Sequence, residues 1–145
     1  MPKSEISFQI EENLDFSLEK EKKVTNWIKK IAKQEGKKAG NIAYFFCTDD
    51  YLLNINRQFL KHDFYTDIIT FDYSEDNKIE GEIFISVDRV KDNALKFKQP
   101  FQKELMRIII HGVLHLCGHK DKKPTDKKRM RVKEDEALVT MDDKL

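Results

Sequence analysis

The 145-residue sequence contains only two cysteines and three prolines, and it lacks a long uncharged run. Cys47 and Cys117 lie 70 residues apart with no CxxC pair, which is typical of reduced thiols in a cytosolic protein rather than of a disulfide framework. No uncharged stretch approaches the roughly 18 residues that cross a bilayer, and residues 1–16 show no basic region leading into an apolar run. We therefore expect a cytoplasmic protein with no membrane span.

The chain also has no strong excess of either charge. Its 27 Lys and Arg nearly balance 26 Asp and Glu, so a preference for an anionic partner has to come from local clustering. The length fits one domain, residues 1–145, with a sizeable apolar core.

Hydrophobic periodicity predicts an α+β domain, with a small mixed four-stranded sheet and about five surrounding helices. The expected strands cover residues 6–11, 41–47, 67–73 and 81–87, with a hairpin or loop at 74–80. The expected helices cover residues 18–36, 48–60, 87–99, 101–118 and 124–141.

The predicted helix at 101–118 carries His111 and His115 in its most apolar part, so we expect it to be central and buried. Side chains four residues apart lie on one helical face and can direct two ring nitrogens to one point. Two core histidines bonded to their neighbours are the alternative. Gly118 can end the helix and return the chain, which would bring Asp121 to the same point as a third metal ligand at the end of this helix.

The spacing His-x-x-x-His-x-x-Gly-x-x-Asp matches the extended zinc motif of metzincin-type hydrolases, with Asp121 in place of their third histidine. Zinc peptidases have a glutamate directly after the first histidine, and this chain has Gly112 there, so peptidase chemistry lacks its base. Cys117 lies about 200° round the helix from His115, which favours a core thiol over a metal ligand.

The segment HGVLHLCGHKD (111–121) resembles the HGxLHLxGyDH signature of the YbeY family. The segments INRQFLKHDFYTDIITFDY (55–73) and GEIFIS (81–86) resemble two further blocks of that family. The resemblance implies a metal-dependent, single-strand-specific endoribonuclease of rRNA maturation (16S 3′ end processing) and ribosome quality control. It also implies a mixed four-stranded sheet, one Zn²⁺ held by the signature residues, and rRNA with the ribosome or a ribosomal protein as partners.

Two departures from the family pattern affect the expected site. Asp121 occupies the position of the last signature histidine and His119 that of a tyrosine, so either could supply the third ligand beside His111 and His115, with the register favouring Asp121. An anionic ligand makes a bound water harder to deprotonate and favours harder metals such as Mn²⁺.

The second departure is Leu60, which stands where the family has an arginine. Arg57 lies three residues earlier on the same predicted helix and could send its guanidinium to the same place. Arg57 is therefore a candidate for catalysis and for RNA contact, and Lys61 and His62 are further candidates for RNA contact. The residue that acts as the base is not identified from the sequence, and His119 or a metal-bound hydroxide is the candidate for that role.

Between residues 120 and 133 the chain has eight Lys or Arg against two Asp. Such a run is either a solvated helix face or, beside a metal, a surface for an RNA backbone that includes Lys122 and Lys123. The alternative function is a ribosome-associated RNA-binding factor with a structural metal and weak or no nuclease activity.

Overall fold

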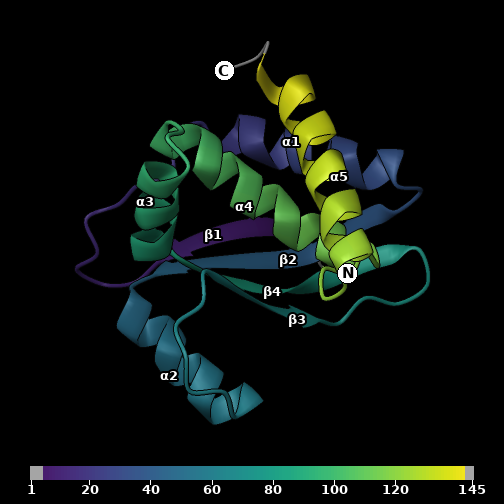
Figure 1. The fold of residues 1–145 in the computed structure, drawn as a ribbon. Helices are drawn as coiled ribbons and strands as arrows, with labels where there is room; N and C mark the ends of the chain where they lie inside the picture. Colours follow the sequence, from purple (N-terminus) through teal and green to yellow (C-terminus); the bar gives the residue numbers. More distant parts are fainter. Residues whose placement is uncertain (1–4, 143–145) are drawn as a thin grey trace.

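The computed structural model describes residues 5–142, which form a four-stranded sheet and five helices (Figure 1). The elements are β1 (Ile6–Ile10), α1 (Glu21–Gln34), β2 (Lys38–Cys47), α2 (Asp49–Leu60), β3 (Ile68–Asp72), β4 (Lys78–Ser86), α3 (Val87–Lys96), α4 (Phe101–Leu116) and α5 (Pro124–Asp142). The predicted α+β class is confirmed. None of the helices in this part of the chain is long and apolar enough to cross a membrane.

The sheet has the order β1-β2-β4-β3, with β1, β2 and β4 parallel and β3 antiparallel to β4. Residues 73–77 connect β3 to β4, and the bridge Glu75↔Lys78 closes the turn of this hairpin. Strand β4 lies between β2 and β3, and Ser86 at its carboxyl end is fully buried.

Helices α1 and α4 cover one face of the sheet, α5 packs on α4, and α2 lies on the opposite face (Figure 1). The main core fills the space between the sheet and helices α1 and α4. A smaller cluster lies between the sheet and α2 and consists of Cys47, Leu52, Ile69 and Phe84. Trp27 joins α1 to α5 because its indole N–H donates to the carbonyl of Ala137 at 3.0 Å.

Helix α4 is held close to the sheet. The hydroxyl of Tyr44, a fully buried residue of β2, donates to the carbonyl of Ile109 at 2.9 Å. Gly112 faces β4, where a Cβ would lie 2.8 Å from Cδ1 of Ile83. A glutamate at position 112 would therefore meet the sheet, so the residue that removes peptidase chemistry also permits close packing.

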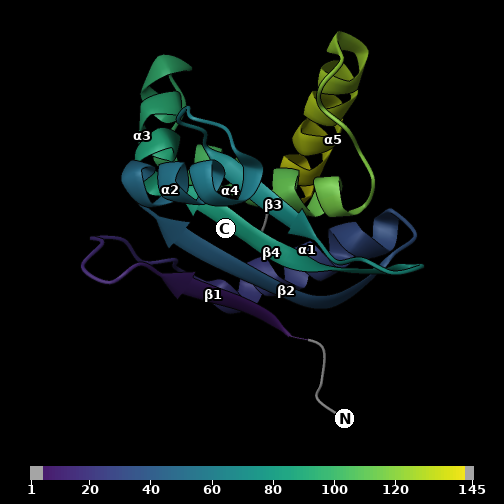
Figure 2. The same ribbon diagram turned by 90° about the horizontal axis from the view of Figure 1, so that it is seen from below.

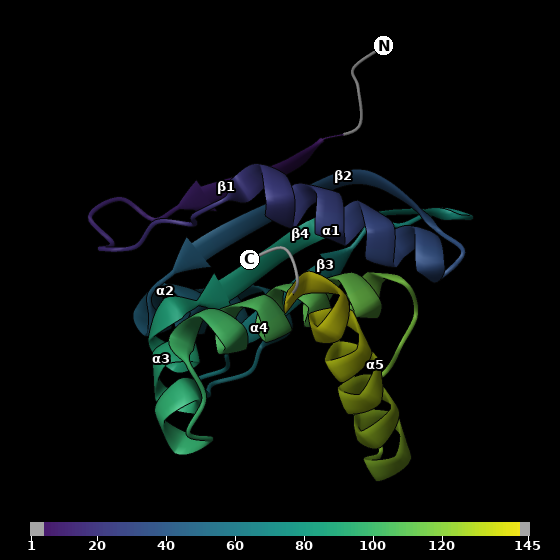
Figure 3. The ribbon, with the colours of Figure 1, turned by 90° about the horizontal axis from the view of Figure 1, so that it is seen from above.

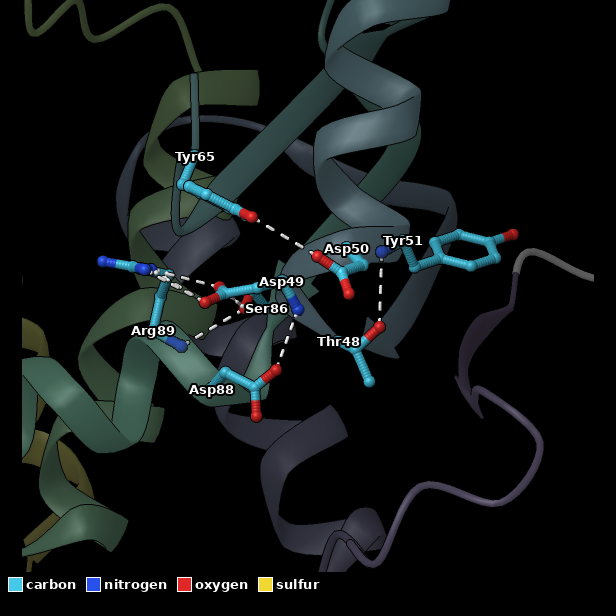
Figure 4. Close-up of polar contacts among 8 residues, drawn as sticks. All are labelled: Thr48, Asp49, Asp50, Tyr51, Tyr65, Ser86, Asp88 and Arg89. Carbon is cyan, nitrogen blue, oxygen red and sulfur yellow. Dashed lines mark hydrogen bonds and ion pairs between the residues drawn. The ribbon is translucent and has the colours of Figure 1, made fainter. Parts of the chain in front are cut away.

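The first turns of α2 and α3 bind each other (Figure 4). The backbone N–H of Asp49 donates to Oδ2 of Asp88 at 2.9 Å, while the Asp49 carboxylate accepts from Ser86 Oγ at 2.7 Å and from Arg89 Nη2 at 3.0 Å. The Arg89 guanidinium also lies 5.3 Å from the ring centre of Tyr65. The contact with Tyr65 joins the loop after α2, which leads into Asp67, to α3.

Helices α3 and α5 extend past the β3 edge of the sheet on either side of α4 (Figures 2 and 3). Helix α3 ends at Lys96, three residues earlier than expected, and Lys98 has a left-handed backbone with φ 54°. Helix α4 therefore lies between α3 and α5, which flank it on either side.

Candidate functional site

A cleft of about 460 Å³ lies over α4, between α3, α5 and the start of β3. Its polar lining includes acidic groups on several elements and a basic side on α5. The ionisable residues of the lining are Asp67, Glu104, Arg107, His111, Asp121, Lys127, Arg131 and Glu134. The cleft therefore brings together parts of the chain from residue 67 to residue 134.

The turn after α4 returns the chain across the helix end, as the sequence predicts. Gly118 has φ +103°, and the N–H of His119 donates back to the carbonyl of Leu114 at 3.1 Å. A left-handed backbone of this kind favours glycine. Asp121 is thereby placed with Oδ2 3.2 Å from His111 Nε2 and Oδ1 3.6 Å from His115 Nε2.

His119 is directed away from this point. Its Nε2 lies 2.5 Å from Oε1 of Glu35 on α1, and the second oxygen of Glu35 accepts from Lys133 Nζ at 3.1 Å. His119 is not among the residues that line the cleft. The geometry thus brings Asp121, and not His119, to the two histidines of α4.

The other ring nitrogen of His111 meets a buried carboxylate on α5. Nδ1 of His111 lies 2.7 Å from Oε2 of Glu134, whose side chain is 7% exposed. Arg107, one turn earlier on α4, donates from Nη1 to Oε1 of Glu134 at 3.0 Å and from Nη2 to Asp135 at 2.8 Å. Both oxygens of Glu134 therefore have a partner.

Electrostatics in the cleft shift several pKa values. Burial lowers the pKa of His111, but the hydrogen bond to Glu134 and the charges of Glu134, Asp121 and Asp67 outweigh it, so the pKa is raised. Burial raises the pKa of Asp67, which the charge of His111 opposes in part. Burial likewise raises the pKa of Glu104 against the effect of Arg107.

The expected RNA-contacting residues are not brought into this cleft. Arg57 is bound to Asp63 beside α2, Lys61 is the left-handed residue that ends α2, and the His62 ring stacks on Phe64. Lys122 and Lys123 are exposed on the turn before α5 but do not line the cleft. Lys127 and Arg131, one turn apart on α5, are the cations of the basic run that do.

Across residues 5–142, no three His, Cys, Asp or Glu side chains form a complete metal-binding group. What supports a metal is the position of one carboxylate, that of Asp121, which lies within 3.6 Å of a nitrogen on each of the two histidines of α4.

Both cysteines are free thiols, and burial raises the pKa of Cys117 to about 11, so its uncharged form is favoured.

Sequence reasoning missed Glu134, Arg107 and Glu104. The signal for the last two was available, because charged residues in a helix that is otherwise apolar all round have to be paired. Glu134 carried no such signal, since it stands among lysines and acids on a helix whose polar residues are mostly exposed.

Comparison with known proteins agrees with the fold and the motif. The family profile described as endoribonuclease YbeY matches residues 6–142. A protein named endoribonuclease YbeY from Phocaeicola vulgatus is 55% identical over 120 residues, which cover 83% of this chain and 87% of that protein. Another of the same name from Flavobacterium psychrophilum is 51% identical over 133 residues, covering 92% and 94%. The solution structure of a Thermotoga maritima protein matches with a TM-score of 0.65 and 26% identity, over 94% of this chain and 89% of that one.

Proposed function

We propose that this chain, which belongs to the endoribonuclease YbeY family, depends on a metal ion and cleaves single-stranded RNA at the cleft over α4. The observation that carries the proposal is the position of Asp121 beside His111 and His115, at the rim of a cleft with a basic wall. RNA is the substrate because the relatives are named endoribonucleases.

The spacing of Asp121 from His111 and His115 supports a zinc ion held by these three side chains. Two ligands of a tetrahedral zinc, each at about 2.0–2.2 Å, lie about 3.4 Å from each other. The two distances from Asp121 to the histidine nitrogens, 3.2 and 3.6 Å, are close to that value. We assign His111, His115 and Asp121 as the residues that would hold one zinc.

We assign roles in hydrolysis to three side chains of the cleft and to the metal. A zinc at this point would supply positive charge for the phosphoryl oxygens and acidify a water. Lys127 and Arg131 bind the phosphates beside the scissile one, since their charges are fixed on one face of α5. Asp67 holds or accepts a proton at its carboxylate, because its raised pKa brings it nearer to neutral pH.

We further propose that the RNA is ribosomal, that the protein acts on the ribosome or with a ribosomal protein in the cytoplasm, and that its role is in rRNA maturation. The free thiols support the cytoplasmic location, and the family membership supports the RNA substrate. The RNA contacts of five residues that do not line the cleft then lie outside it: Arg57, Lys61, His62, Lys122 and Lys123.

A second function has one observation in its favour. No side chain of α2 lines the cleft, and Arg57 is engaged with Asp63, so the arginine that Leu60 replaces has no substitute from that helix. A cleft without this arginine is expected for an RNA-binding factor that has a structural metal and cleaves little RNA. This second function predicts that the zinc-loaded protein binds single-stranded RNA without cutting it.

Purified protein tests both functions on a labelled single-stranded RNA. We expect cleavage that a chelator abolishes and zinc restores, and a loss on the order of 10²–10³-fold for His111→Ala, the size of effect of losing metal stabilisation of charge. Asp121→Asn should lower zinc affinity more than His119→Ala, because Glu35 holds His119 elsewhere. Cleavage that survives both chelation and His111→Ala would refute the proposal.

A further inference from the structure

We propose that Glu134 is a positioning residue that fixes the proton of His111 on Nδ1 and so keeps Nε2 available to a metal ion. This inference rests on the proposed function, because it takes His111 as a metal ligand. It concerns a residue on α5, 23 positions from His111, that the signature at 111–121 does not contain.

The two nitrogens of the His111 ring face different carboxylates. Nδ1 faces Glu134 Oε2 at 2.7 Å, and Nε2 faces Asp121 Oδ2 at 3.2 Å. A neutral imidazole carries one N–H and one lone pair, and only the nitrogen with the lone pair can bind a metal. The partner of Nδ1 therefore decides whether Nε2 is a ligand.

Glu134 is built to be an acceptor at this position. Its other oxygen accepts from Arg107, which is always a cation, and its side chain is almost completely buried at 7% exposure. Because one oxygen of Glu134 accepts from Arg107 and the other faces Nδ1 of His111 at 2.7 Å, we assign Nδ1 as the donor and Oε2 as the acceptor. Carboxylates that orient a metal-binding histidine in this manner raise metal affinity by about 10- to 100-fold.

Arg107 makes Glu134→Gln an informative variant. A glutamine has one oxygen and one NH₂ group, and the Arg107 guanidinium needs the oxygen. The NH₂ would then face Nδ1 of His111, which has to give up its proton, and the proton moves to Nε2. The reverse orientation would place two donors against each other at Arg107.

The first measurement is ¹⁵N NMR of the histidine rings in metal-free protein, at a pH where His111 is neutral and with its signals assigned through His111→Gln. We expect the Nδ1–H tautomer in the wild type and the Nε2–H tautomer in Glu134→Gln. Glu134→Asp keeps a carboxylate and should retain Nδ1–H. A wild type with Nε2–H overturns the proposal, whatever the variants do and whether or not they fold.

The second measurement is zinc affinity by competition with a chelating dye. We expect the dissociation constant of Glu134→Gln to rise about 10- to 100-fold. The matched control is Asp135→Asn, which removes an equal charge from the same Arg107 (Nη2 to Oδ1, 2.8 Å) but does not contact His111. Its side chain is 57% exposed, so its effect should stay within about threefold.

The outcomes separate this inference from the proposed function. A wild type that binds no zinc contradicts the metal site itself. A wild type that binds zinc tightly, together with a folded Glu134→Gln variant of equal affinity, leaves the metal site standing and overturns the role of Glu134. Folding of each variant is checked by circular dichroism and thermal unfolding.

Discussion

Single residues decide how near α4 comes to the sheet. Gly112 is a helix-interior glycine, a position at which alanine normally stabilises a helix by about 0.5–1 kcal/mol. Here a Cβ would lie 2.8 Å from Cδ1 and 3.1 Å from Cγ2 of Ile83, a residue with no exposed surface. The packing cost outweighs the helix preference.

We therefore predict that Gly112→Ala lowers the free energy of unfolding, by about 1–3 kcal/mol, as overpacked cores do. Urea unfolding measures it. Ile83→Val removes the Cδ1 atom that a Cβ would meet, so the double variant Gly112→Ala, Ile83→Val should lose less than the sum of the two single losses. Simple additivity would show that the contact with Ile83 is not the cause.

At the scale of elements, the ion pairs between helices hold the turn after α4 in place. Glu35, at the end of α1, is bound by His119 of the turn and Lys133 of α5. Burial alone would raise the pKa of Glu35, but the hydrogen bonds and charges of these two partners lower it below 4.5. The Glu35 carboxylate therefore links the end of α1 to the turn after α4 and to α5.

The pH dependence of stability follows from that lowered pKa. Protonation is easier in the unfolded chain, so the stabilisation by Glu35 is complete above about pH 4.5 and is lost as pH falls through the lower, folded-state pKa. We expect Glu35→Gln to cost about 1–2 kcal/mol at pH 6 and progressively less below pH 4.5. Urea unfolding from pH 3 to 7 measures the difference, and a cost that stays constant over this range would contradict the assignment.

The sequence predicted the middle of each helix and strand better than its ends. The centres of all nine elements were predicted, because alternation and helical spacing are strongest there. Strands β2 and β4 each begin three residues earlier than expected, at Lys38 and Lys78, which pair with each other. Their first three residues, KAG in β2 and KIE in β4, contain only one large apolar side chain, so no local pattern indicated that they belong to a strand.

For the whole molecule, the distribution of charge matters more than its sum of +1. The basic run at 120–133 divides between a turn whose lysines are exposed and the first turns of α5, of which Lys127 and Arg131 face the cleft. A strand of RNA held along α5 would release counterions there.

We predict that Lys127→Gln with Arg131→Gln weakens binding of single-stranded RNA and reduces the slope of log K against log salt by about 0.7 for each phosphate that is no longer neutralised. Fluorescence anisotropy at several salt concentrations measures it. Lys22→Gln with Lys29→Gln, both exposed on α1, removes the same charge away from the cleft and should change the slope less. Equal effects would mean that only net charge attracts the RNA.

The sequence by itself determined the α+β class, the buried helix with His111 and His115 on one face, and the turn at Gly118 that returns Asp121 to them. These features depend on local spacing and backbone conformation, which the order of residues specifies directly. Only the tertiary structure decided that His119 turns to Glu35, that Arg57 stays outside the cleft, and that Glu134 meets His111. Those contacts join residues 23 to 84 positions apart, and the packing of α1, α4 and α5, not any local pattern, sets which side chains meet.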